Sequence, residues 1–129
     1  MESNLEFITS ITICPSDIRK VERHLEIAQT HLKPLRNILF TPLFAAPDSV
    51  NRIHAMSDDG SRVMLDSGGY YVQIGRIKYE ELYLPLLNFY KSNRWAAAYT
   101  LPDHVPLSTD SPETVERKVR ACKSITPRI

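Results

Sequence analysis

The amino-acid sequence predicts an α/β fold in which parallel strands alternate with helices, and three observations support this class. Short apolar runs recur along the chain at 5–14, 38–40, 63–65 and 95–99. Longer segments whose apolar residues repeat at helical spacing separate these runs. Pro, Gly, Asp and Ser mark the turns between the two kinds of segment. Strands that alternate with helices need crossover connections, so this order indicates a parallel sheet, either open and doubly wound or part of a β/α barrel.

The first half of the chain is expected to contain two strands and two helices. Residues 5–14 are rich in β-branched side chains and predict a strand that ends at Pro15. Ser16 or Asp17 is expected to cap a helix that stops near Lys33-Pro34, because proline disfavours helical geometry in the residue before it. A second strand covers 38–40. Pro47 then starts a short helix, which a turn cluster at 58–61 follows.

The second half continues the alternation. Residues 63–65 predict a strand buried on both faces, and 72–76 an irregular connector or a short extra strand. A tyrosine-rich stripe over 79–90 predicts a core-facing helix, which Pro85 is expected to kink or to divide. Residues 95–99 are the fourth candidate strand. A last helix, capped by Asp110 or Ser111, is expected to turn Val115, Val119 and Cys122 inward and Glu116, Arg117, Lys118 and Arg120 outward.

Length and composition indicate a single domain over 1–129, since a hydrophobic fraction of 43% is enough for a core. The net charge of +1 gives no global field of the kind that attracts nucleic acid. Cys14 and Cys122 lack metal-ligand spacing, so they are expected to be buried or incidental thiols, and the four histidines to be structural. Without a long apolar run or a signal-peptide pattern, the chain is expected to be cytoplasmic and to have no membrane partner.

The stretch 62–71 carries the strongest functional signal. Asp66 follows a predicted strand at the sheet edge where ligands gather in α/β folds. Gly68 and Gly69 allow close approach to the backbone, and Tyr70 adds an aromatic face. Together these features suit a planar ligand that hydrogen-bonds through its edge, such as a nucleobase. The alternative is an ordinary strand-to-loop turn, with Asp66 or Ser67 as a cap and Tyr70 in the core.

Three segments resemble one enzyme family. Leu65-Asp-Ser-Gly-Gly-Tyr70 resembles the Asp-Ser-Gly-Gly-Phe/Tyr-Gln signature of tRNA-guanine transglycosylases, which exchange guanine for queuine or archaeosine precursors. Phe40-Thr-Pro-Leu-Phe44 resembles the Phe-Thr-Pro segment upstream. Tyr99-Thr-Leu-Pro-Asp-His-Val-Pro106 resembles the second aspartate loop, in which Asp103 matches the base-recognising carboxylate.

The resemblance implies a fold, an activity and a set of site residues. The fold would be the amino-terminal half of a TIM-type β/α barrel, since a whole barrel takes about 250 residues. The activity would be replacement of guanine in tRNA, or in DNA, by a 7-deazaguanine. Asp66 would handle proton transfer and purine contacts, and Asp103 would accept hydrogen bonds from the purine. Ser67, Gly68, Gly69 and Tyr70 would complete the purine site, with the Tyr70 ring stacked on the base.

The chain also departs from the family pattern. The family's nucleophilic aspartate, its glycine-rich segment and its Cys/His zinc site would lie beyond Ile129, so this chain is expected to hold no cofactor and to be inactive alone. Tyr71 stands where the family has glutamine. A truncated product, a trimmed chain and a split enzyme completed by a second chain, or by another copy, are all compatible. The alternative function is a non-catalytic α/β binding module or partner subunit.

Overall fold

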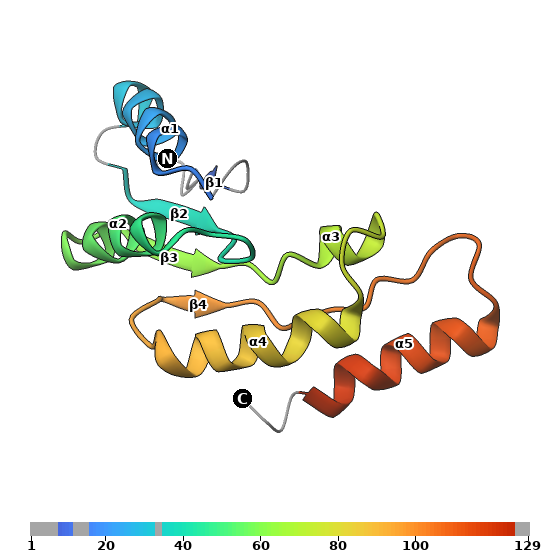
Figure 1. Ribbon diagram of the computed structural model, residues 1–129. Coiled ribbons are helices and arrows are strands. Elements are labelled where there is room, and N and C mark those ends of the chain that lie inside the picture. The colour runs from blue at the N-terminus through green and yellow to red at the C-terminus, as the bar shows by residue number, and fades with distance from the viewer. Residues whose placement is uncertain (1–7, 12–15, 33–34, 126–129) are drawn as a thin grey trace, which may run out of the picture. The chain divides into compact units, whose positions relative to one another are not determined.

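The computed structural model describes residues 8–11, 16–32 and 35–125, with the side chains of 124 and 125 left aside. Two compact units form, one from residues up to Asp66 with Trp95–Tyr99, the other from Ser67–Arg94 and the residues from Thr100 onward. Four strands and five helices follow each other in the described residues (Figure 1): β1 Thr9–Ile11, α1 Ile18–His31, β2 Asn37–Phe40, α2 Pro47–Asp58, β3 Arg62–Leu65, α3 Gly69–Gln73, α4 Tyr79–Ser92, β4 Ala98–Tyr99 and α5 Pro112–Ile125.

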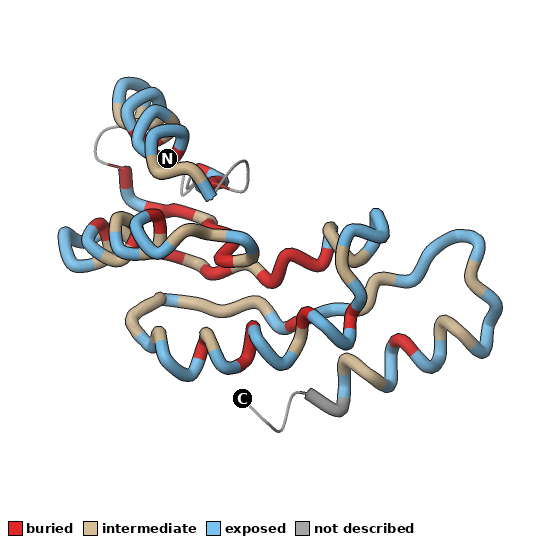
Figure 2. Tube along the Cα trace, in the orientation of Figure 1, coloured by how far each residue is buried: buried red, intermediate tan, exposed pale blue. Residues whose placement is uncertain are grey.

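The first unit contains a four-stranded sheet in the order β1-β2-β3-β4, and every neighbouring pair is parallel. Phe40 pairs with Leu65, so β2 and β3 end at the same level. Residues along β2 and β3 are mostly buried (Figure 2), as the apolar composition of these strands predicts. This confirms the α/β class with an all-parallel sheet.

Two helices complete the first unit. The side chain of Asp17 accepts a hydrogen bond from the Arg19 N–H at the start of α1, which confirms one of the two predicted caps. Pro47 opens α2 as predicted. Contacts link α1 with β1 and α2 with β3. A buried core results, with Ile11, Val21, Leu25, Ile38, Phe40, Ile53, Val63 and Leu65 at no more than 1% exposure.

The second unit is built from α3, α4 and α5. Tyr79 and Leu87 of α4 form a small apolar cluster, against which Val72 of α3, Tyr83 and Ala121 of α5 pack. Tyr79 and Tyr90 are buried, so the tyrosine stripe faces the core as predicted. None of the helices in the described ranges has the length and apolar run that crossing a membrane would require.

Residues 72–76 were expected to form an irregular connector or a short extra strand, and the structure corrects this in part. Val72 and Gln73 belong to the helix α3, whereas 74–76 are irregular, as expected for a connector. Gly68 explains the difference, because its φ of 74° turns the chain into a helical start that β-prone residues alone do not signal. Pro85 lies inside α4 and does not divide it. Burial of Leu82, Leu86 and Tyr90 along one face holds this helix together.

Two expectations for α5 are also wrong, whereas Glu116, Arg117 and Arg120 are exposed as expected. Lys118, expected outward, is 7% exposed, whereas Val119, expected inward, is 41% exposed. The cause is a polar anchor, since Lys118 pairs with Asp110 at the loop before the helix. The fourth strand is shorter than predicted, being limited to Ala98–Tyr99. Expectations for 5–7, for 12–14 with Cys14, and for Lys33-Pro34 fall outside the described residues.

Candidate functional site

Asp66 occupies the end of β3 in the first unit, and a buried threonine holds it. The Asp66 N–H donates to the Phe40 carbonyl over 2.8 Å, which extends the β2–β3 pairing by one step. Thr41, the residue after β2, is 1% exposed and donates its hydroxyl to Asp66 Oδ2 over 3.2 Å. The Asp66 carboxylate is half-buried and oriented by this bond.

Ser67, Gly69 and Asp103 meet in the second unit. The Ser67 hydroxyl donates to Asp103 Oδ1 over 3.0 Å and accepts the Gly69 N–H over 3.2 Å. The Ser67 N–H donates to the Thr100 hydroxyl over 2.7 Å. Two segments 36 residues apart in the chain are thus joined through one hydroxyl. Ser67 is buried, whereas Asp103 is exposed.

Gly69 has no room for a side chain. A Cβ at this position would lie 2.3 Å from Asp103 Oδ1 and 3.0 Å from its Cγ, well inside van der Waals contact. Gly68 has φ 74° and starts α3. The two glycines therefore serve different purposes: Gly68 supplies a left-handed turn, and Gly69 lets the Asp103 carboxylate lie against the backbone.

Tyr70 presents its ring to solvent. It is 66% exposed, and its ring meets that of Tyr71 edge to face, with 6.2 Å between centroids. Arg76 in turn lies over the Tyr71 ring, 5.6 Å from its centroid. The interpretation of Tyr70 as a core residue of an ordinary turn is therefore wrong. A large exposed aromatic next to Gly69 offers a stacking surface.

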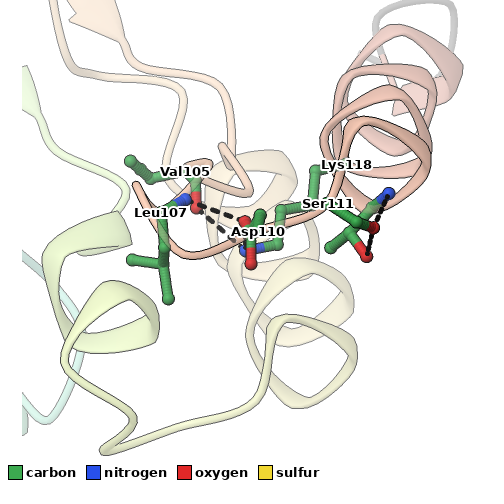
Figure 3. Close-up of polar contacts among 6 residues, drawn as sticks. Val105, Leu107, Asp110, Ser111 and Lys118 are labelled. Atoms are coloured by element: carbon green, nitrogen blue, oxygen red, sulfur yellow. Dashed lines mark hydrogen bonds and ion pairs between the residues drawn. The ribbon is translucent and has the colours of Figure 1, made fainter.

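The loop that carries Asp103 is anchored to α5 at its far end (Figure 3). Lys118 Nζ lies 2.5 Å from Asp110 Oδ2 and 3.3 Å from the Val105 carbonyl. The Leu107 N–H donates to the same Asp110 oxygen over 2.8 Å. This backbone hydrogen bond, followed by the bond from Lys118, lowers the pKa of Asp110. Ser111 caps α5 by accepting the Thr114 N–H.

His104 anchors the near end of the loop. The His104 ring stacks on the Tyr79 ring with 4.6 Å between centroids. The backbone N–H of His104 donates to Cys122 Sγ over 3.1 Å. Burial lowers the pKa of His104, and the positive charge of Lys118 adds to this effect. Burial also raises the pKa of Tyr79 to about 12, helped by Cys122. The imidazole thus packs against α4 within the second unit.

Sequence reasoning identified the charged and aromatic members of this site but missed their supports. Thr41 donates to Asp66, and Thr100 accepts from Ser67. Lys118 anchors the loop that carries Asp103. Threonine is common at strand ends, so neither Thr41 nor Thr100 carried a signal that sequence reasoning could have used. In the part of the chain that the structure describes, no group of three or more His, Cys, Asp or Glu side chains could hold a metal ion.

Comparisons with known proteins found no relative of this chain. No protein-family model, no curated protein and no solved structure matches this chain.

Proposed function

We propose that this chain takes part in base exchange on tRNA or DNA, in the manner of the tRNA-guanine transglycosylases that its motifs resemble, and binds guanine or a 7-deazaguanine. The observation that carries the proposal is the contact of Ser67 and Gly69 with Asp103. The two motifs that resemble the family's aspartate loops are distant in sequence. Their side chains nevertheless meet within one unit.

The chemistry of Asp103 suits the edge of guanine. Guanine carries an N1–H and a 2-amino group side by side, and a carboxylate accepts two such parallel donors. Ser67 occupies one of the roughly four lone-pair positions of the Asp103 carboxylate, which leaves acceptor capacity on both oxygens. Adenine presents an acceptor at N1, so the same carboxylate would reject it.

Tyr70 and Asp66 take the remaining roles. The exposed Tyr70 ring would stack on the base, an interaction worth about 1–3 kcal/mol in single-stranded nucleic-acid complexes. Asp66, the residue before Ser67 in the chain, would transfer a proton to or from the purine, with Thr41 fixing its orientation. The nucleophile of the resembled family is a later aspartate, and no residue of this chain is assigned that role.

The strand order supports a barrel segment over a doubly wound sheet. A doubly wound sheet reverses direction at a switch point, so consecutive strands do not stay in sequence order across it. Here β1 to β4 follow each other without reversal, as they do in a β/α barrel. We therefore extend the proposal to a partial TIM-type barrel.

Calorimetric titration with 7-aminomethyl-7-deazaguanine tests the proposed function. The wild-type chain should bind, and Asp103→Asn should weaken binding by at least about tenfold, because hydrogen bonds to a charged group contribute about 1.5–3 kcal/mol. Gly69→Ala should weaken binding similarly while the fold is kept, since the three atoms nearest to its Cβ all belong to the end of the flexible Asp103 side chain. Asp59→Asn, at an exposed helix end, serves as the control. A folded wild-type chain that does not bind would contradict the proposal.

A further inference from the structure

We infer that Lys118 is a positioning residue for base recognition, which holds the loop that presents Asp103. This inference rests on the proposed function and extends it to a residue outside the motifs. Residues 100–107 have no regular secondary structure, so the chain itself does not fix the position of Asp103. Ser67 binds the Asp103 carboxylate, and contacts from α4 and α5 hold the residues that follow Asp103.

Lys118 joins three points of the loop. Its ammonium group contacts the Val105 carbonyl at 3.3 Å and Asp110 Oδ2 at 2.5 Å. Asp110 also accepts the Leu107 N–H at 2.8 Å. Val105 is two residues from Asp103, and the intervening His104 is bonded to Cys122 of the same helix. One face of α5 therefore fixes the loop on the carboxyl side of Asp103.

The burial of this ion pair indicates that the pair serves to fix the position of the loop. The side chains of Lys118 and Asp110 are only 9% and 12% exposed, whereas the pair of Arg120 and Glu116 on the same helix is 76% and 62% exposed. Burying two charges costs desolvation free energy, and apolar residues of similar volume often stabilise a fold equally well. Apolar replacements cannot hydrogen-bond to a carbonyl and an N–H, so they would not keep the loop in place.

A double-mutant cycle separates this role from general stability. Asp110→Leu combined with Lys118→Met removes the buried pair while keeping its volume, and Glu116→Leu with Arg120→Met is the matched exposed control on α5. Affinity for 7-aminomethyl-7-deazaguanine is measured for each, in the wild-type background and with Asp103→Asn, together with the melting temperature.

The buried-pair variant should remain folded and bind the base about tenfold more weakly, which corresponds to about 1.4 kcal/mol. In the Asp103→Asn background the same change should have almost no further effect, since there the loop no longer presents the recognising carboxylate. If the variant fails to fold, Asp110→Asn gives the same comparison with a smaller change.

Three results would contradict the inference. Unchanged affinity in the buried-pair variant would overturn the role of Lys118 and leave the proposed function intact. An equal loss in both backgrounds would show a general structural effect without positioning. Absence of binding by the folded wild-type chain would overturn the proposed function, and this inference with it.

Discussion

At the scale of single residues, Phe44 is the most unusual backbone position in the described chain. Its φ is 62°, in the left-handed region that bulky side chains avoid, and its side chain is 53% exposed. It lies three residues after Thr41, in the loop whose first residue orients Asp66. Strained positions of this kind often occur near functional loops, because the surrounding structure must hold them in place.

Comparison of Phe44→Gly with Phe44→Ala measures this strain. Both variants lose the ring, but only glycine adopts the left-handed conformation without a steric penalty. Phe44→Gly should therefore be more stable than Phe44→Ala by about 1 kcal/mol in urea denaturation. Equal stability, or a more stable alanine variant, would show that the backbone is not left-handed at this position in solution.

His104 makes the stability of the Asp103 loop depend on pH. Its folded-state pKa is lowered, chiefly by burial and then by Lys118, relative to about 6.5 in an unfolded chain. The stability contributed by the neutral imidazole is complete above pH 6.5 and is lost as the pH falls through the folded-state pKa.

His104→Phe should keep the stacking on Tyr79 and remove this dependence. Melting temperatures between pH 7.5 and 5 should decrease less for the variant than for the wild-type chain. His31→Gln, in the exposed last turn of α1, is the control and should keep the wild-type slope. An unchanged slope in His104→Phe would contradict the assignment of this effect to His104.

At the scale of secondary-structure elements, α4 tolerates a costly residue. Pro85 lies in the helix interior, where it lacks an N–H and crowds the preceding turn. Pro85→Ala should raise the free energy of unfolding by about 1–3 kcal/mol, because proline costs about 3 kcal/mol relative to alanine in a helix. Asn88→Ala on the same helix controls for the gain in helix propensity alone. A loss of stability in Pro85→Ala would show that the helix depends on the proline.

The elements that the sequence predicted well are those whose burial and caps agree with local propensity. Asp17 at α1, Pro47 at α2 and the apolar run of β3 each combine a terminal signal with a buried face. Local pattern failed where a single contact decides the structure. Gly68 starts α3 by adopting a positive φ, and Lys118 lies buried in α5 because it pairs with Asp110. Neither feature can be read from hydrophobic periodicity.

The candidate site, like the secondary-structure elements, was predicted only in part. The resemblance implied that Ser67 and Asp103 serve one purine site, but their hydrogen bond was not predicted, since nothing in the spacing of 36 residues indicates a contact. Thr41 and Thr100 were missed because threonine is common at strand ends and carries no distinctive pattern. Their role becomes clear only from the sheet register, in which β2 and β3 end at the same level.

At the scale of the whole molecule, the overall charge is weak. The net charge is +1, and many charged groups of the described chain are paired, as Arg52 is with Glu22 and Arg120 with Glu116. A weak overall field favours recognition through a base-sized site over broad electrostatic binding. We therefore expect binding of the free base to depend only weakly on salt.

The most direct test of base recognition is a titration of the isotope-labelled chain with 7-aminomethyl-7-deazaguanine, followed by amide chemical shifts. We expect the shifts to concentrate at Gly69, Tyr70 and His104, the residues that surround the Asp103 carboxylate in sequence or in contact. The absence of shifts at saturating base would contradict base recognition. So would shifts confined to α1, where Arg19, Lys20, Arg23, His24 and Ile27 line a shallow depression that is open to solvent.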